Sequence, residues 1–410
     1  MAQSGATPTD TSKFERLSLP ERVLSAFLAL SRQMLGSPEV AGDPALLVCW
    51  PWSSGNKFQN LLYANAKASG FAVLPIQDLK ELEAISWPGP IVLHAHWFSQ
   101  IYAAAKDDDE AEEAGTDALR RMLSFRTRSS ARLLWTAHNV FPHRMPYRKA
   151  ALRLRHDILA TFDGIHLMAD EHKVILETAY AMPLPRRFVV PHPLYTGAYP
   201  DEVSRTEARA HFGISQDATV ILNFGALHAY KGLDLLLRAF AALPRDDNPD
   251  TRLLLAGRPA DPAVAEALRS AADKDSRIIL CSEFIADEDV QNYFRAADIV
   301  VLPYAESLNS GVVWLSFTFG LPIILPNAEA FQHVRNLGGI CSFSANSAED
   351  LAEALTHSIA AVRAGATQQL PNLSAHTPEK VSSDFFRSAR ALTDTKARVI
   401  GGEVLSRIKS

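Results

Sequence analysis

The sequence predicts an α/β protein built from two doubly wound, parallel-sheet domains. Three observations predict this fold class. Short apolar runs without polar interruptions alternate along the chain with helix-like segments, as expected for strands buried on both faces of a parallel sheet. The alternation restarts after a segment rich in Pro, Gly and Tyr at 192–205, which is typical of a linker. The chain of 410 residues is also long for a single hydrophobic core.

The first domain is expected at 1–200. Residues 20–35 begin with Pro and Glu and carry apolar residues at helical spacing, which predicts an amphipathic helix packed on the domain rather than a membrane anchor. A second helix is expected at 60–70, where Gly70 ends it. The strands are expected at 45–50, 71–76, 90–97, 131–139, 162–170 and 186–192.

The second domain is expected at 201–380. Its helices are predicted at 233–244, 263–274, 287–297 and 312–319. Its strands are predicted at 218–227, 251–257, 277–282, 298–304 and 322–325. Two such sheets joined by a linker predict a cleft between the domains, which is the usual ligand site of this architecture.

Composition excludes several classes of protein. A net charge of −5 argues against general nucleic-acid binding. The three cysteines lie far apart and form no zinc motif, so we expect free thiols, buried at Cys49 and Cys281. The N-terminus lacks the order of a signal peptide, and no apolar run approaches the roughly 18 residues of a membrane span. We therefore expect a cytoplasmic protein, with peripheral contact at the inner face of the membrane as one option.

Charge is unevenly distributed in the first domain. Residues 107–113 are acidic, whereas 120–155 contain ten Arg or Lys and no Asp or Glu. One interpretation is a solvated face balanced by the acidic run; the other is a patch that contacts anionic lipid. Vesicle sedimentation with charge-reversed variants distinguishes the two. The arginines that would make the contact are Arg120, Arg121, Arg126, Arg128 and Arg132.

The region 297–331 carries the strongest functional pattern. A β-branched strand ends at Pro303, a polar loop follows, and an apolar helix begins near Val312. The free amides and the dipole at that helix start suit an anion such as a nucleoside diphosphate. The polar residues of this loop are Glu306, Ser307, Asn309, Ser310 and Gly311.

A second loop, FGALHAYKGLD at 224–234, follows the first strand of the same domain. Gly225 allows a close turn, and Lys231 at a helix start is well placed to hold phosphate oxygens. His228 lies between them. Taken alone, Lys231 could equally be a surface lysine.

Together with LLLAGRP at 253–259, these segments resemble the retaining glycosyltransferases of the GT-B fold, family-4-like (glycosyl transferases group 1), and in particular a bacterial polysaccharide-type subgroup. The resemblance covers 220–330 almost continuously. Two features depart from the family pattern. The arginine that usually precedes the lysine is absent near Ala226 and His228. The paired glutamates are degraded: Glu306 or Ser307 fills the first position, and the second falls on Trp314 or Leu315.

The resemblance implies two Rossmann-like domains and transfer of a hexose, with retention, from a GDP- or UDP-linked sugar to a glycan or lipid-linked acceptor. Such a protein would serve exopolysaccharide, capsule or glycolipid synthesis. The donor would contact Gly225, His228, Lys231 and the 306–311 loop, with Glu306 catalytic. The family also implies a final helix within 381–410 that crosses back to the first domain. We expect no cofactor and no metal ion, because a lysine and a helix terminus can replace a divalent cation and no Asp-x-Asp motif occurs.

Polar residues also end the strands of the first domain. His94, His96 and His138 follow two strands, where side chains of a parallel sheet reach a ligand site; structural histidines are the plainer alternative. His138 resembles the family histidine that reaches the transferred sugar. The loop after the first strand contains Ser54, Gly55 and Asn56, which could approach a phosphate or the acceptor, or form an ordinary turn.

Two other functions stay open. One is a nucleotide-sugar epimerase on the same architecture, and the other is a non-catalytic relative that binds nucleotide sugars or glycans, in view of the missing arginine and glutamate. A nicotinamide dehydrogenase is disfavoured because no G-x-G-x-x-G follows a strand.

Overall fold

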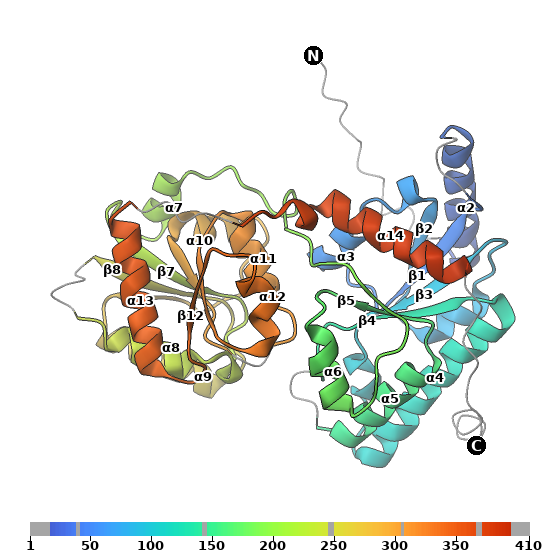
Figure 1. Cartoon of the computed structure of the whole chain (residues 1–410), viewed down its shortest axis with the longest axis horizontal. Coiled ribbons are helices and arrows are strands. Elements are labelled where there is room, and N and C mark those ends of the chain that lie inside the picture. The colour runs from blue at the N-terminus through green and yellow to red at the C-terminus, as the bar shows by residue number, and fades with distance from the viewer. Residues whose placement is uncertain are drawn as a thin grey trace. The chain divides into compact units, whose positions relative to one another are not determined.

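The computed structural model describes residues 17–37, 42–141, 146–244, 250–304, 307–365 and 371–394. The chain forms two compact units (Figure 1). The first contains Met1–Leu167, Leu176–Val190 and Val381–Ser410, and the second contains Met168–Ile175 and Pro191–Lys380. The boundary thus lies at Val190 rather than at residue 200, and a short segment before it belongs with the second unit.

The first unit is built on a six-stranded sheet in the order β2-β1-β3-β4-β5-β6, with every described strand pair parallel. Its strands are β1 (Ala45–Trp50), β2 (Phe71–Pro75), β3 (Ile91–Ala95), β4 (Arg132–Thr136), β5 (Gly164–Leu167) and β6 (Arg187–Val189). Its helices are α2 (Leu19–Leu35), α3 (Lys57–Leu62), α4 (Asp108–Ser129), α5 (Arg148–Thr161), the end of α6 (His172–Tyr180) and α14 (Pro378–Asp394). Short 3₁₀ turns lie at Lys67–Ser69, Leu79–Ala84 and Ser99–Tyr102.

The second unit has the strand order β12-β11-β10-β7-β8-β9, again parallel throughout. Its strands are β7 (Thr219–Phe224), β8 (Thr251–Ala256), β9 (Ile278–Cys281), β10 (Ile299–Val301), β11 (Ile323–Pro326) and β12 (Ile340–Phe343). Its helices are α7 (Arg205–His211), α8 (Leu233–Ala241), α9 (Pro262–Lys274), α10 (Val290–Ala296), α11 (Gly311–Thr318), α12 (Gln332–Arg335) and α13 (Ala348–Arg363). Short 3₁₀ turns lie at Ala229–Lys231, Glu329–Phe331 and Ser374–His376.

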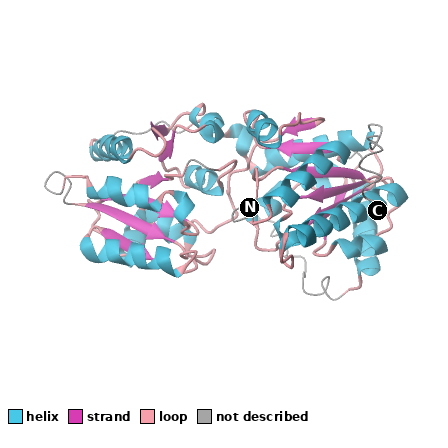
Figure 2. Ribbon diagram, turned by 90° about the horizontal axis from the view of Figure 1, so that it is seen from below, coloured by secondary structure: helices cyan, strands magenta, loops and turns pink. Residues whose placement is uncertain are grey.

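Helices cover both faces of each sheet (Figure 2). In the second unit, the strand side chains alternate between two apolar clusters. Val220 and Leu222 of β7 pack in the cluster that contains Phe294 and Trp314, whereas Ile221 packs in the cluster that contains Phe240. A strand buried on both faces needs the continuous apolar run that the sequence shows. The predicted two-domain doubly wound fold is therefore confirmed.

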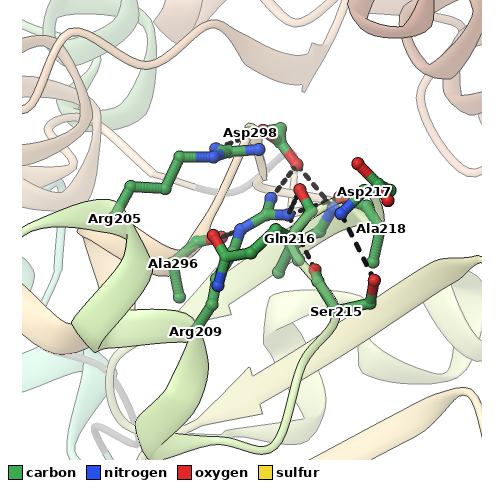
Figure 3. A network of polar contacts seen from close by, with 9 residues as sticks. Arg205, Arg209, Ser215, Gln216, Asp217, Ala218, Ala296 and Asp298 are labelled. Carbon is green, nitrogen blue, oxygen red and sulfur yellow. Dashed lines mark hydrogen bonds and ion pairs between the residues drawn. The ribbon is translucent and has the colours of Figure 1, made fainter.

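An ion-pair network stabilises the amino-terminal ends of the central strands of the second sheet (Figure 3). The guanidinium of Arg209 on α7 is fully buried and donates to Asp298 at 2.7 Å and to the carbonyls of Ser215, Gln216 and Ala218. Asp298 also accepts from Arg205 at 2.6 Å and from the amide of Val220 at 2.8 Å. The network joins α7 to the starts of β7 and β10, so that it holds the two central strands in register at their amino-terminal ends.

Helix α14 packs on the first unit. Ser382 donates to the carbonyl of Leu62 and accepts from the amide of Asn65, and Arg390 donates to the carbonyl of Gly70. Phe385 and Phe386 lie against Tyr63, with ring centroids 5.9 and 6.1 Å away. The residues beyond 394 lie outside the described part of the chain.

Some local expectations were wrong. The helix predicted at 60–70 begins earlier, at Lys57, because Asn56 caps it by accepting from the amide of Gln59, and it ends at Leu62. Cys281 is half-buried rather than buried, whereas Cys49 is buried; all three cysteines are free thiols. Helix α2 buries Val23 and Leu30 but leaves Leu24, Leu28 and Leu35 exposed. No described helix has the length and apolarity that a membrane crossing requires.

Candidate functional site

The carboxyl ends of β7 and β10 mark the point at which the second sheet changes winding direction. From β7 the chain moves to β8 and β9 on one side, and later to β10, β11 and β12 on the other. Ligands of open α/β sheets bind in the crevice outside such a switch point. The loops that leave these two strands contain Gly225, Lys231, Ser307, Asn309 and Ser310. The structure therefore gathers these five predicted donor residues at one edge of the sheet.

Two glycines allow the loops to meet. Gly257, after β8, has φ +142°, and a Cβ built on it would lie 2.1 Å from the carbonyl oxygen of Gly225. Gly232, at the start of α8, has φ +70°, and its Cβ would lie 2.5 Å from the carbonyl oxygen of Pro303 after β10. Any side chain at either position would force these backbones apart. The glycines thus bring the three loops into direct contact.

Lys231 lies among these loops. Its ammonium Nζ lies 3.5 Å from the point a Cβ on Gly225 would occupy and 5.7 Å from the ring centroid of Tyr304. Burial lowers its pKa to about 8. Within the described ranges, no carboxylate pairs with this ammonium group. A half-buried cation of this kind is unfavourable by itself and becomes favourable when an anion arrives.

The start of α11 lies on the other side of the switch point. Ser310 precedes the helix, is 8% exposed, and its hydroxyl lies 2.5 Å from the hydroxyl of Tyr304. A Cβ on Gly311 would lie 2.7 Å from the hydroxyl of Tyr195. Ser307 donates to the carbonyl of Asn309 at 2.9 Å, which folds the loop on itself. The first amides of a helix have no partner within it, so this end offers donors to an anion.

The place of the second family glutamate falls on Trp314 or Leu315, which are 1% and 4% exposed. The indole of Trp314 stacks with the rings of His376, at 4.3 Å, and His192, at 5.6 Å between ring centroids. Neither a buried indole nor a leucine side chain can accept a hydrogen bond from a ribose hydroxyl. Glu306 lies outside the described residues. His228 is half-buried, with its ring 5.1 Å from that of Tyr230.

In the first unit, the switch point lies between β1 and β3. Ser54 and Gly55 are exposed in the loop after β1, and no atom lies within 4 Å of a Cβ built on Gly55, so the space around it does not require glycine. Asn56 caps α3 with its side chain. The structure thus gives Asn56 a local structural role and leaves Ser54 and Gly55 at the surface.

The histidines of the first unit form a buried cluster instead. His94 and His96 are 0% and 1% exposed, and both lie 2.6 Å from the hydroxyl of Tyr63. His138, at 8% exposed, lies 2.9 Å from His96. His96 and His138 also line a pocket of about 250 Å³ together with Trp97, Asn139 and Arg155. His138 is therefore placed where a ligand can enter.

Sequence reasoning missed several residues here. Tyr63 lies in the turn after α3, and no pattern links it to the distant histidines. Tyr304 follows Pro303, three residues after β10 ends at Val301, and a tyrosine just beyond the carboxyl end of a buried strand is the signal that could have found it. Arg155 lines the pocket, with its guanidinium 4.9 Å from the ring centroid of Phe98.

The predicted arginine patch needs one correction. Arg126 is 7% exposed and is paired with buried Asp163 at 3.1 Å, so it holds the fold and is not available to a lipid surface. Arg120 and Arg121 pair with Asp117, and Arg121 also pairs with Glu83. Sequence inspection missed these acidic neighbours because Asp117 precedes the basic stretch. Contact of Arg120, Arg121, Arg128 and Arg132 with anionic lipid stays a prediction.

The described residues contain no group of three or more His, Cys, Asp or Glu side chains that could hold a metal ion.

Comparison with known proteins agrees with this geometry. Residues 218–360 match the family model described as glycosyl transferases group 1. This part of the chain is similar to the glycosyl transferases group 1 family. It includes both loops of the switch point, Lys231 and the start of α11.

Curated relatives match over limited stretches. A GDP-mannose:glycolipid 4-beta-D-mannosyltransferase from Xanthomonas campestris pv. campestris is 26% identical over 136 residues, which cover 32% of this chain and 38% of that protein. A D-inositol 3-phosphate glycosyltransferase from Mycolicibacterium smegmatis is 28% identical over 214 residues, which cover 48% of this chain and 45% of that protein. The chain thus matches less than half of the length of each.

Solved structures share the fold over most of the chain. Sucrose-phosphate synthase from Thermosynechococcus elongatus superposes with a TM-score of 0.57 at 15% identity, covering 85% of this chain and 96% of that one. HepE of Anabaena in complex with UDP-glucose superposes with a TM-score of 0.56 at 15% identity, covering 89% and 99%. The architecture is the GT-B fold.

Proposed function

We propose that the protein is a glycosyltransferase that moves a hexose from a GDP- or UDP-linked sugar to a hydroxyl of a glycan or lipid-linked acceptor. The observation that carries this proposal is the half-buried Lys231 ammonium, without a carboxylate partner among the described residues, at the switch point of a group 1 domain. A cation in this position suits the diphosphate of a nucleotide sugar. The GDP-mannose and UDP-glucose named for the similar proteins are donors of this class.

The chemistry follows from where charge develops. As the glycosidic bond to phosphate breaks, negative charge grows on the leaving diphosphate. Lys231 and the first amides of α11 would stabilise that charge, and pre-placed donors of this kind can contribute several kcal/mol. The same residues would do the work often done by a divalent cation, so we expect transfer to persist after treatment with EDTA. Retention at the anomeric carbon and a role of His138 at the sugar are proposed on the family resemblance.

The biological setting belongs to the same proposal. A glycolipid acceptor appears in the name of the Xanthomonas relative, which supports a lipid-linked acceptor and a place in polysaccharide or glycolipid synthesis. One observation favours a second candidate, a non-catalytic nucleotide-sugar-binding protein: a buried residue, Trp314 or Leu315, falls where the family has its second glutamate. Turnover separates the two, because only a transferase releases nucleoside diphosphate in step with acceptor glycosylation. An epimerase would convert the nucleotide sugar into its epimer without an acceptor and without net release of nucleoside diphosphate.

A thermal-shift screen against UDP, GDP, dTDP and ADP tests the proposal. A ligand that binds the native state raises the unfolding temperature in proportion to RT ln(1 + [L]/Kd). We expect one or two of the four to produce a shift and the corresponding nucleoside monophosphate to produce much less, since it lacks the second phosphate. No shift with any diphosphate at millimolar concentration would contradict the proposed function.

Affinity for the nucleoside diphosphate is expected to fall as the pH rises through about 8, where Lys231 loses its proton. Below that pH the ammonium attracts the diphosphate, and above it the neutral amine does not. Binding also brings negative charge to Lys231 and raises its pKa, so the complex takes up a proton when it forms near pH 8. Calorimetric titration in two buffers of different ionisation enthalpy measures this uptake.

Lys231→Arg is the matched control, since a guanidinium keeps its charge throughout this range. The variant should bind with an affinity that does not change through pH 8. An unchanged pH profile in the wild-type protein, without proton uptake, would exclude Lys231 as the phosphate ligand.

A further inference from the structure

Arg155 on α5 differs from the other buried arginines of the described chain. Four arginines are buried there, and three of them have a carboxylate partner. The three pairs are Arg126 with Asp163 at 3.1 Å, Arg209 with Asp298 at 2.7 Å, and Arg277 with Asp275 at 2.7 Å. Arg155 is 4% exposed, and no carboxylate of the described residues forms an ion pair with it. A buried guanidinium without a counter-charge is unfavourable, so its presence needs a reason.

The immediate neighbours of Arg155 are neutral. Its guanidinium carbon lies 4.9 Å from the ring centroid of Phe98 and 4.8 Å from that of Trp135. Burial raises the pKa of the Tyr180 hydroxyl, and the charge and a hydrogen bond of Arg155 oppose that rise. Arg155 Nε has no hydrogen-bond partner among the described residues. Aromatic rings and a neutral hydroxyl attract a cation but do not neutralise its charge.

Arg155 also lines the pocket of about 250 Å³ in the first unit. Trp135 lines the same pocket, and its indole Nε1–H is a second buried donor without a partner in the described part of the chain. A guanidinium and an indole can donate hydrogen bonds but cannot accept them. The pocket thus brings together a positive charge from α5 and an unmet donor from β4, and a ligand that only accepts would satisfy both.

We propose that this pocket binds an oxyanion, a phosphate or carboxylate group on the acceptor sugar, with Arg155 as its counter-charge and Trp135 as a further donor. The planar fork of a guanidinium matches the oxygens of both groups. Trp97 and Phe98, which line the pocket too, offer aromatic rings to the carbon face of a sugar. That the ligand is the acceptor rests on the proposed function, whereas binding of an oxyanion does not.

Calorimetric titration of the full chain with inorganic phosphate, glucose 6-phosphate, glucuronate and glucose tests the proposal. We expect the anions to bind and neutral glucose to bind much more weakly. The sugar anion that binds more tightly identifies the group as phosphate or carboxylate. Arg155→Met keeps the apolar stem and should weaken anion binding roughly 30-fold or more. Arg155→Lys keeps the charge but loses the fork, so it should bind with intermediate affinity.

Arg153→Met is the matched control on the same helix. The side chain of Arg153 is 47% exposed and pairs with Glu112 at 2.8 Å, so its loss should leave anion binding unchanged. The unfolding temperature gives a second comparison. Removing an uncompensated buried charge should leave the stability of Arg155→Met equal to that of the wild type or higher. A less stable Arg155→Met with undiminished anion binding would show that Arg155 only supports the fold, and would overturn the proposal.

Inorganic phosphate can also enter the site of Lys231, which belongs to the other unit. The titrations are therefore repeated in Lys231→Met. We expect the sugar anion to bind Lys231→Met as it binds the wild type and to lose affinity for Arg155→Met. The nucleoside diphosphate should show the opposite pattern. Loss of sugar-anion binding in Lys231→Met but not in Arg155→Met would place the anion in the nucleotide site and overturn the proposal.

The outcomes separate this inference from the proposed function. Inorganic phosphate is small enough to reach any site that holds the phosphate of a larger acceptor. No binding of any of the three anions at millimolar concentration, or equal binding by the wild type and Arg155→Met, would therefore overturn the inference even if transfer occurs. If the anions bind through Arg155 but no nucleoside diphosphate binds, the inference stands and the proposed function fails.

Discussion

Replacing Lys231 by Met is expected to weaken binding of the nucleoside diphosphate by about 2 to 5 kcal/mol, which is roughly 30-fold to several thousandfold in Kd. Met keeps the length and apolar stem of the side chain and removes only the charge. The diphosphate then enters a site that has lost its half-buried cation. Isothermal titration with the nucleotide selected by the thermal-shift screen measures the change.

The same substitution is expected to stabilise the free protein. The charged form of Lys231 is disfavoured by burial, which is why its pKa falls from 10.5 to about 8. The loss of folding stability caused by the buried charge is fully present below about pH 8. It disappears as the pH approaches 10.5, where Lys231 is also deprotonated in the unfolded chain. The unfolding temperature of Lys231→Met should therefore exceed that of the wild type at pH 7, and the difference should shrink at high pH.

Lys274→Met is the control for both measurements, the affinity for the nucleoside diphosphate and the unfolding temperature. Lys274 is exposed at the end of α9, so its loss should change neither the affinity nor the unfolding temperature appreciably. Loss of affinity together with loss of stability in Lys231→Met would point to a lysine that supports the fold, and would argue against the phosphate role.

Asp298→Asn should destabilise the second domain by about 3 to 5 kcal/mol, because it leaves the fully buried guanidinium of Arg209 without its counter-charge. Asn has nearly the same shape as Asp, so the loss of stability comes from the missing charge and not from a cavity. Hydrogen exchange of the β7 and β10 amides measures the loss of stability of the second domain alone. Exchange in these strands should accelerate roughly a hundredfold or more, at about 1.4 kcal/mol per factor of ten.

Asp234→Asn supplies the comparison. Asp234 pairs with Arg238 on the surface of α8, with both side chains exposed, and pairs of this kind contribute about 0.3 to 0.5 kcal/mol. Its effect on exchange should be small. Equal effects of the two substitutions would contradict the inference that the buried network fastens the central strands.

The central strands could be predicted from the sequence because a strand that is buried on both faces is a continuous run of apolar residues. Ile299–Val301 has no polar position, and neither has Leu46–Trp50. The edge strand β12 was missed: Ile340, Cys341 and Ser342 are not buried, so no continuous apolar run was needed there. Helix α13 after it was missed as well, although Ser347 caps it.

The second-domain loops could be predicted from motif and order, since Lys231 and Ser310 each follow a recognisable strand. The buried histidine cluster of the first unit could not. Tyr63, Thr136 and His166 lie in contact with the predicted His94 and His96, and they stand on different elements whose spacing in the sequence carries no signal. Only the register of β3, β4 and β5 brings the histidines and Thr136 together.

The docking of α14 has a consequence for synthesis on the ribosome. Tyr63, Phe71 and His94 complete their packing with Phe385 and Phe386, which are translated some 290 to 320 residues later. Until those residues emerge, the nascent first domain presents an aromatic surface to the cytosol or to chaperones, while the second domain can fold entirely from residues already made. The domain that is translated first is therefore the one that is finished last.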